Sequence, residues 1–393
     1  HKPVEYAMGE ATHRAVAAPL ALLALLPPEE RPDEILLLCT PEAKAANTDL
    51  VPAFGDYAPT EVVEVFTDPG EQGIRAFLAG VADRIPDGAE LTLDLTHGFR
   101  HLSFLLYTTL LYLTALREVR IRAAYYAYGA PGEVSPFYDL RPLLELPLWF
   151  HALRTFAETG NAAAIARRLE SQPEFKAGLQ LASDLRRISQ AYLSALPLEY
   201  GYRSRRFLEQ QQASLRRVLR RHGLPLADEL AAFLTEPLER FALPAGAVDT
   251  SENWKAAVVC DEAELDRQAR LIDDLFDRGH TASAIRLLNE WIVSWAALQT
   301  GESDRWLDFR GVRRRAARQL DHLAGLATAR GGPFTVELDE QQQRLATLWA
   351  RVCEMRNTYA HHGMQGKDTL ERHRLIRRIR DLWHRWREQE RPS

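Results

Sequence analysis

The hydrophobic pattern of this 393-residue chain changes once, near Pro147. Before that point short β-rich runs alternate with helical patterns, and beyond it helical periodicity alone continues to the C-terminus. Alternating strands and helices predict a parallel sheet covered by helices on both faces, which is the Rossmann-like architecture. The sequence therefore predicts an α/β Rossmann-like N-terminal domain followed by an all-α C-terminal domain.

The same pattern predicts the individual elements and the domain limits. The expected strands are residues 34–39, 61–66, 91–95 and 119–128, and the expected helices of the first half are residues 11–26, 41–51, 70–83 and 98–117. Helical segments then fill the remainder, interrupted by a loop at 243–253 that is rich in Gly, Pro, Ala and Ser or Thr. We expect an N-terminal domain at 1–147, a helical connecting region at 148–253 and a C-terminal domain at 254–393.

Composition excludes several classes of protein. The net charge of −5 argues against a general nucleic-acid coat or a membrane-surface protein, so RNA contacts are expected only from local basic patches. Residues 313–315 and 372–387 are such patches, although each is equally typical of a solvated helix face. The apolar runs are too short or too interrupted to span a bilayer, and the three cysteines lack CxxC spacing, so we expect a cytoplasmic protein with reduced thiols and no membrane contact.

A cation, an amide and an imidazole lie close together near the C-terminus, at Arg356, Asn357 and His361. The helical pattern is expected to end here because Gly363 follows, and Gly is common just past a helix end. Phosphodiester cleavage needs a cation on the non-bridging oxygens and a proton shuttle near neutral pH, which Arg and His supply. The alternative interpretation is a solvated helix end at which His and Arg favour the helix dipole.

Spacing alone does not identify a site in a chain with 44 arginines and 12 histidines, because one Arg-x4-His match is expected by chance. Arg217 and His222 form a second match. They precede Gly223 and Pro225, and we interpret them as a basic helix end without catalytic function.

A second group of polar residues, Thr96 to His101, lies where an apolar strand becomes a long helix. Thr96 is expected to cap that helix, Gly98 to allow close approach, and Arg100 to add positive charge, which together favour an anion site at free backbone N–H groups. The alternative is a polar turn that only caps itself. His97 and His101 are four residues apart, but no third metal ligand accompanies them, so no metal site is predicted.

Other phosphate-binding motifs are absent from the sequence. No GxGxxG follows a strand and no GxxxxGK[ST] occurs, which excludes dinucleotide-dehydrogenase and P-loop interpretations.

Two families resemble parts of this chain. The run Asp94-Leu95-Thr96-His97-Gly98-Phe99-Arg100-His101, with the segments at 2–6 and 40–44, resembles the CRISPR-associated Rossmann fold (CARF) domain of type III CRISPR accessory proteins. The Arg-Asn-x-x-Ala-His sequence at 356–361 resembles the R-x4-6-H motif of HEPN ribonucleases. Members of the CARF family normally open with a strand and a Gly-rich ligand loop, and neither precedes His1.

The resemblance implies a cyclic-oligoadenylate-activated, metal-independent endoribonuclease that cuts single-stranded RNA in antiviral defence. It implies that Thr96, His97, Gly98, Phe99 and Arg100 bind the activator. Cyclic tetra-adenylate is the expected ring, although ring size is not determined by these residues. No cofactor is expected for catalysis.

In the ribonuclease site, the resemblance implies that Arg356 binds the scissile phosphate and His361 transfers protons. Asn357 would orient one of these two side chains or hold the phosphate. The substrate 2′-OH would attack and leave a 2′,3′-cyclic phosphate. The resemblance also implies that two such motifs face each other across a homodimer as one composite site, with higher oligomers left open. The rotational symmetry of the ring suits a two-fold dimer that presents the Thr96 to Arg100 turn twice.

Two alternatives remain open. A degenerate HEPN motif would make the protein a nucleotide sensor or RNA-binding regulator, and a CARF domain that also degrades its ligand would make it a ring nuclease.

Overall fold

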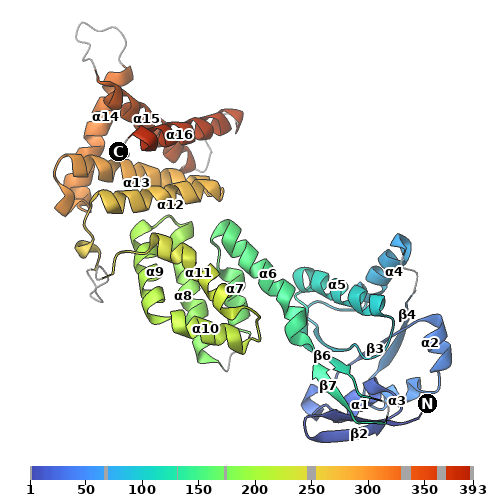
Figure 1. The fold of residues 1–393 in the computed structure, drawn as a ribbon. Helices are drawn as coiled ribbons and strands as arrows, with labels where there is room; N and C mark the ends of the chain where they lie inside the picture. Colours follow the sequence, from blue (N-terminus) through green and yellow to red (C-terminus); the bar gives the residue numbers. More distant parts are fainter. Residues whose placement is uncertain are drawn as a thin grey trace. The chain divides into compact units, whose positions relative to one another are not determined.

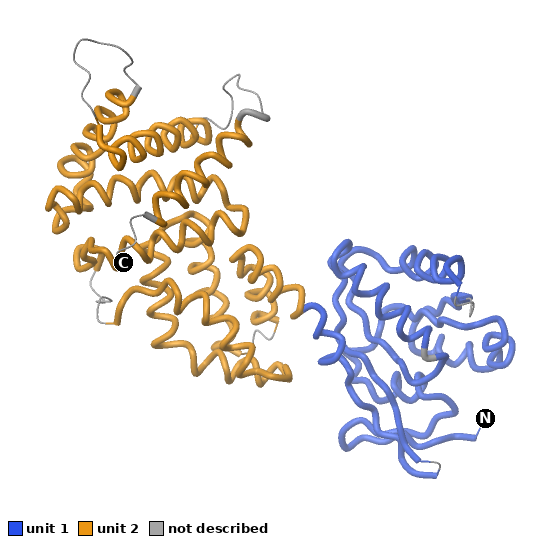
Figure 2. The backbone as a smooth tube through the Cα atoms, turned by 45° about the horizontal axis from the view of Figure 1, so that its top comes forward, with its two compact units in different colours: residues 1–148 blue, residues 149–393 orange. Residues whose placement is uncertain are grey.

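The computed structural model describes residues 2–65, 70–130, 132–171, 175–245, 254–328, 338–360 and 369–389. The chain divides into two compact units, unit 1 at His1–Leu148 and unit 2 at Trp149–Ser393 (Figure 2). Unit 1 is a mixed sheet with helices and unit 2 is helical, which agrees with an α/β region followed by an all-α region. Residues 148–253 and 254–393 fall in the same compact unit, so the separation predicted between them remains a prediction.

Unit 1 contains seven strands among the described residues (Figure 1). These are β1 (Val4–Met8), β2 (Ala11–Ala15), β3 (Ile35–Cys39), β4 (Thr60–Glu64), β5 (Glu90–Asp94), β6 (Arg120–Ala127) and β7 (Ser135–Asp139). Its helices are α1 (Ala18–Leu25), η1 (Pro28–Glu30), α2 (Pro41–Ala46), α3 (Val51–Gly55), α4 (Glu71–Ala82) and α5 (Arg100–Leu116).

The sheet is mixed, so the prediction of a purely parallel sheet was wrong. Five strands lie in the order β2-β1-β7-β6-β5, and β3 pairs with β4 in a second, two-stranded sheet. The pairs β1–β7, β3–β4 and β5–β6 are parallel, whereas β1–β2 and β6–β7 are antiparallel. Only Gly9 and Glu10 separate β1 from β2, and Gly9 has φ +59°, which suits a two-residue hairpin turn. A hairpin makes its two strands antiparallel, and the expected helix at 11–26 therefore begins only at Ala18.

Helices cover two opposite faces of the strands in unit 1. Along β3, Leu36 and Leu38 pack on a core that contains Phe77 of α4 and Leu110 of α5. The alternate residues of β3 pack on a second core that includes α1 and Phe54 of α3. Side chains alternate between faces along a strand, so a strand buried on both faces reads as a continuous apolar run, as β3 does.

Unit 2 consists of packed helices. The boundary between the two units falls within its first helix, α6. The α-helices are α6 (Arg141–Thr159), α7 (Ala163–Leu169), α8 (Lys176–Leu193), α9 (Pro197–Gln210), α10 (Gln212–Arg221), α11 (Ala227–Phe241), α12 (Glu262–Asp277), α13 (Thr281–Gln299), α14 (Arg314–Thr328), α15 (Glu340–Ala360) and α16 (Thr369–Gln389). Short turns of 3₁₀ helix at η2 (Trp254–Ala257) and η3 (Ser303–Arg305), and of π helix at η4 (Phe309–Arg313), join some of them. Helix α15 packs against α13, α14 and α16.

Candidate functional site

Helix α15 presents Arg356 and Asn357 to solvent. Its buried face is formed by residues at helical spacing, and these are Leu345, Leu348, Trp349, Val352 and Met355. Arg356 follows Met355 and is turned by about 100° from that face, so it is exposed together with Asn357. No carboxylate in the described part of the chain pairs with Arg356. Its guanidinium is therefore available for an external anion.

The neighbours of Arg356 fix the end of α15 in place. Thr358 is buried and its hydroxyl donates to the Glu354 carbonyl oxygen (3.0 Å). The Asn289 amide lies 3.4 Å from the Cys353 sulfur, and burial raises the pKa of that thiol to about 11, so it is inert near neutral pH. Burial also raises the pKa of Tyr359, and the positive charge of Arg372 on α16 opposes this rise.

The structure brings Arg356 and Asn357 onto adjacent exposed positions but does not place the third predicted residue. Helix α15 continues through Asn357 to Ala360, so the motif lies in the last turns of the helix. His361 lies outside the described residues. Its geometry relative to Arg356 remains a prediction.

The second Arg-x4-His match is split between surface and core. His222 is only 6% exposed and its ring packs edge-on against Trp149, with centroids 5.5 Å apart. Arg217 is exposed on α10. This separation supports the interpretation of the pair as a helix end rather than as one catalytic group.

The turn that follows β5 is pinned to the end of β6. The Leu95 amide donates to the Tyr125 carbonyl oxygen (2.8 Å), and the Ala127 amide donates to the Thr96 hydroxyl oxygen (2.9 Å). The predicted helix-capping role of Thr96 was wrong, because α5 begins at Arg100 with Phe99 at its N-cap and no side-chain cap. The Thr96 hydroxyl, which local spacing assigned to the helix N-terminus, instead accepts a hydrogen bond from Ala127, 31 residues further along the chain.

The exposed part of the turn consists of His97, Gly98 and Phe99. Gly98 has φ +120°, a conformation that side-chain-bearing residues rarely adopt, and a Cβ there would meet nothing within 4 Å. Phe99 is 56% exposed and stacks on His101 with ring centroids 5.7 Å apart. The side chain of Arg100 lies outside the described residues, so its predicted ligand contact is not located.

His97 connects this turn to α1. The Ala18 amide, at the first residue of α1, donates to His97 Nε2 over 3.4 Å. The long distance makes this a weak hydrogen bond. An accepting Nε2 implies that the ring proton is on Nδ1, which leaves that atom as the free donor.

Asp94 opens the run that resembles a CARF domain, but the sequence analysis assigned it no role. One carboxylate oxygen accepts from the Thr96 amide (2.8 Å), while Oδ2 is buried without a hydrogen-bond partner among the described residues. Burial raises the pKa of Asp94, and the hydrogen bonds of Thr96 and the nearby His97 oppose this rise. Its position as the last residue of β5 was a sequence signal for such a role, since ligand sites of α/β sheets commonly lie at the carboxyl ends of strands.

The two predicted basic patches differ in how far they are neutralised. Arg313 is largely buried and donates to Ser294 Oγ (3.0 Å) and to Glu290 Oε2 (2.7 Å), so it holds η4 in place rather than facing a ligand. On α16, Arg380 and Arg387 pair with aspartates of α12. The outward side of α16 instead carries exposed arginines without a carboxylate partner in the described part of the chain, and these are Arg374, Arg377, Arg378 and Arg385.

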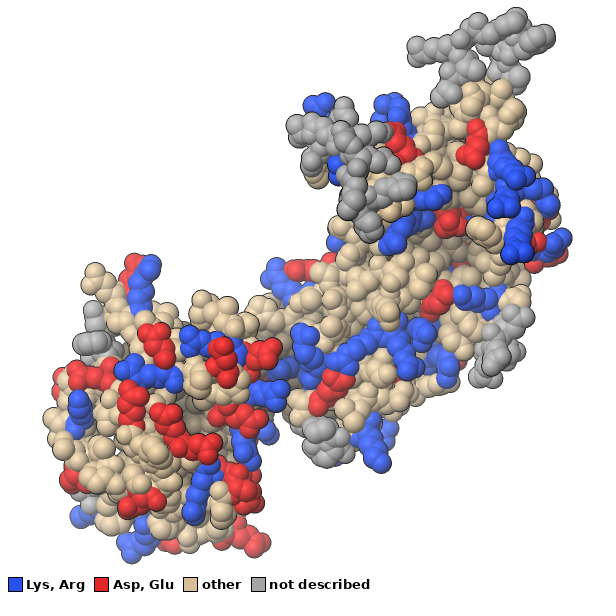
Figure 3. All heavy atoms as spheres, turned by 180° about the vertical axis from the view of Figure 1, so that it is seen from behind, with Lys and Arg blue, Asp and Glu red and all other residues tan. Residues whose placement is uncertain are grey.

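Charge is divided unevenly between the two units. Unit 1 has 11 Lys and Arg against 21 Asp and Glu, whereas unit 2 has 38 against 33. On the face drawn in Figure 3, acidic side chains are frequent over unit 1 and basic ones dominate unit 2. Unit 2 is therefore the better surface for a long polyanion.

The described residues contain no cluster of three His, Cys, Asp or Glu side chains with the arrangement of a metal site. None of their helices is both long and apolar enough to cross a membrane.

The sequence is similar to a characterised protein over part of its length. Over 116 residues, which is 29% of this chain, the sequence is 28% identical to the CRISPR-associated protein MJ1674 of Methanocaldococcus jannaschii. The matched stretch spans 17% of the length of that protein. No protein-family model matches the chain.

Proposed function

We propose that this protein is a cyclic-oligoadenylate-activated, metal-independent endoribonuclease that acts on single-stranded RNA in CRISPR antiviral defence. Unit 1 would be the CARF sensor and the C-terminal part of unit 2 the HEPN nuclease. The observation that carries the proposal is the exposed, unneutralised Arg356 beside Asn357 at the end of a helix whose other face is fixed in the core. Similarity to a CRISPR-associated protein supports the biological setting.

The cleavage chemistry follows from the residue types. The RNA 2′-oxygen attacks the adjacent phosphorus, the P–O5′ bond breaks, and the products are a 2′,3′-cyclic phosphate and a 5′-hydroxyl. Arg356 would stabilise charge on the non-bridging oxygens, and His361 would move a proton to or from the 2′-oxygen or the leaving 5′-oxygen. Asn357 would hold the phosphate or orient His361. A second copy would face the first, so that both motifs contribute to one site.

The turn after β5 suits the sensor role because it combines an exposed aromatic with polar groups. Phe99 could stack on an adenine, and the Nδ1 proton of His97 and the first amides of α5 could reach phosphate oxygens. Unit 1 carries more acidic than basic residues, so its long-range field repels a polyanionic ring. Binding must therefore come from these local contacts.

The test is a cleavage assay with fluorescent RNA, cyclic tri-, tetra- or hexa-adenylate, and excess EDTA. We expect one ring to stimulate cleavage and the products to carry 2′,3′-cyclic phosphate ends. Arg356→Ala and His361→Ala should each lower the stimulated rate by about 10² to 10⁴. Ligand binding should be unchanged in both variants, since the substitutions lie in unit 2.

The matched controls are Arg344→Ala and His322→Ala. Arg344 lies on α15 about 18 Å before Arg356 and pairs with Glu340 (2.7 Å), and His322 is exposed on α14. Both controls should cut RNA at the wild-type rate. A strict need for a divalent metal, or equal losses in controls and motif variants, would reject the proposal. Mass analysis of the recovered ligand separates a nuclease that leaves the ring intact from a ring nuclease.

A further inference from the structure

Helix α10 has a strongly basic outer face. Its ten residues include four arginines and no acidic residue. Its apolar residues Leu215, Val218 and Leu219 are buried, so the arginines lie on the opposite side of the helix. All four arginines are exposed, and they are Arg216, Arg217, Arg220 and Arg221.

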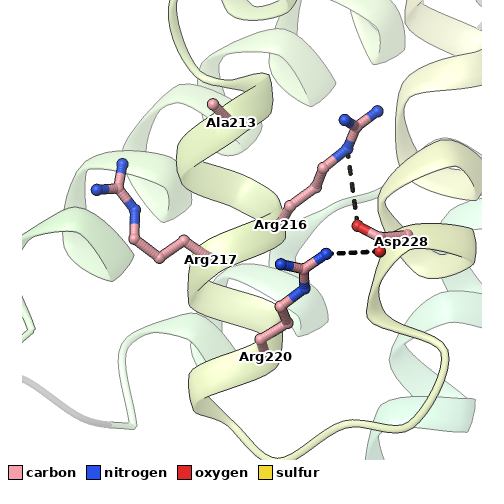
Figure 4. A pocket seen from close by; sticks show the side chains of 5 residues that line it. All are labelled: Ala213, Arg216, Arg217, Arg220 and Asp228. Atoms are coloured by element: carbon pink, nitrogen blue, oxygen red, sulfur yellow. Dashed lines mark hydrogen bonds and ion pairs between the residues drawn. The ribbon is translucent and has the colours of Figure 1, made fainter.

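An open hollow lies along this face and is lined by Ala213, Arg216, Arg217, Arg220 and Asp228 (Figure 4). Arg216 Nε lies 4.0 Å from Asp228 Oδ1, and Arg220 Nη2 lies 2.6 Å from Asp228 Oδ2. Figure 4 shows both side chains directed toward Asp228, with Arg217 directed away from it. One carboxylate thus pairs with two guanidinium groups. The Arg217 guanidinium donates to the neutral hydroxyl of Ser214 (3.3 Å) and has no carboxylate partner among the described residues.

The excess positive charge of this face is accessible to solvent. The side chains of Arg216 and Arg220 are 47% and 64% exposed, so their remaining N–H groups face solvent. Guanidinium groups pair with two oxygens of a phosphate at once, which suits them to a nucleic-acid backbone. None of the described residues that line the hollow is aromatic, so phosphates rather than stacked bases would be recognised there.

The same geometry argues against a membrane as the partner. A basic amphipathic helix binds a bilayer by inserting its apolar face. In α10 that face is already buried within unit 2.

We propose that the arginine face of α10 docks the phosphate backbone of the single-stranded RNA substrate, at a surface separate from the cleavage residues. The identity of the nucleic acid rests on the proposed function. Asp228 competes with the phosphates for Arg216 and Arg220 and so limits how tightly RNA is held. Arg217, the arginine of the second Arg-x4-His match, would then function in RNA binding rather than in cleavage.

The test measures binding to a 2′-O-methyl oligoribonucleotide by fluorescence anisotropy as salt is varied. This probe lacks the attacking 2′-hydroxyl, so binding is measured without cleavage. Each phosphate neutralised on a single strand contributes about −0.7 to the slope of log K against log salt. Replacing Arg216, Arg217 and Arg220 together by Gln should therefore weaken binding and reduce that slope by about 2.

A matched variant removes the same charge elsewhere in unit 2. Arg154, Arg186 and Arg305 are exposed and each pairs with its own carboxylate, so their triple replacement by Gln should leave the slope unchanged. Asp228→Asn should act in the opposite direction and strengthen binding, because it releases two guanidinium groups. All variants change exposed side chains and should retain the wild-type circular dichroism spectrum.

The outcomes separate this inference from the proposed function. Binding that depends on the α10 arginines in a protein that never cuts RNA would support the docking surface and remove the nuclease. Efficient cleavage with equal salt slopes for the two triple variants would overturn the docking surface and keep the nuclease. Unchanged or weaker binding by Asp228→Asn would also overturn it, as would binding to anionic vesicles in place of RNA.

Discussion

Gly98→Ala should destabilise unit 1 through backbone strain alone. Gly98 has φ +120°, and the added Cβ would meet no atom within 4 Å, so no steric clash contributes. Holding a side-chain-bearing residue in such a conformation costs about 1–3 kcal/mol. At a cost of about 2 kcal/mol, a unit of this size should lose roughly 4 to 8 °C in melting temperature.

The structure supplies a control of opposite sign. Gly80 lies within α4, has no positive φ, and a Cβ there also meets nothing within 4 Å. Gly80→Ala should therefore stabilise unit 1 by about 0.5–1 kcal/mol, because alanine loses less backbone entropy in a helix.

The two units can be followed separately because all eight tryptophans lie in unit 2, beginning at Trp149. Tryptophan fluorescence reports the unfolding of unit 2, and hydrogen exchange of peptides from β5 and α5 reports unit 1. Gly98→Ala should raise exchange in those peptides and leave the fluorescence transition unchanged. If Gly98→Ala were neutral or stabilising, like Gly80→Ala, the strain assigned to this turn would be wrong.

Three further predictions concern groups that the structure ties together. Thr96→Val should cost about 1–3 kcal/mol by leaving the Ala127 amide without its acceptor, whereas Thr96→Ser should retain nearly full stability in chemical denaturation. Folding raises the pKa of Asp94, so its contribution to stability is present below the unfolded pKa of about 3.9 and is lost as pH rises through the folded value. The free energy of unfolding of Asp94→Asn should therefore exceed that of the wild type increasingly as pH rises, and a difference that does not vary with pH would contradict this. Arg387→Ala should lower the unfolding midpoint of unit 2 followed by fluorescence, because Arg387 pairs with two aspartates of α12, while the exposed Arg385→Ala should leave it unchanged.

The strands of unit 1 could be predicted where apolar or β-branched residues recur at strand spacing, and the predicted strands at 61–66, 91–95 and 119–128 overlap β4, β5 and β6. The predicted strand at 34–39 corresponds to β3, because burial on both faces leaves an uninterrupted apolar run. Strands β1, β2 and β7 were missed. Much of β2 is exposed and β7 contains Pro136, so neither has the apolar pattern of a buried strand.

The candidate sites, like the strands, could be predicted only as far as local sequence determines them. The residue types and spacing of Arg356 and Asn357 predict a helix end that could bind a phosphate. Both residues are exposed in the structure. The need for Gly98 could likewise be read locally, because its positive φ belongs to the turn itself. The sequence by itself determined the order of an α/β region and an all-α region, and the residues that could carry chemistry.

Only the tertiary structure decided which of those residues are available. Thr96 accepts a hydrogen bond from Ala127 of β6, His222 is buried against Trp149, and Arg313 is held by Glu290 and Ser294. These partners are distant along the chain, and no local pattern encodes them. Two arginines of α10, Arg216 and Arg220, share the carboxylate of Asp228 on the next helix. A side chain is available for a ligand only if folding has not already engaged it in a long-range hydrogen bond or ion pair. For this reason residue spacing identified the candidate residues, and tertiary packing determined which of them remain free to bind a ligand.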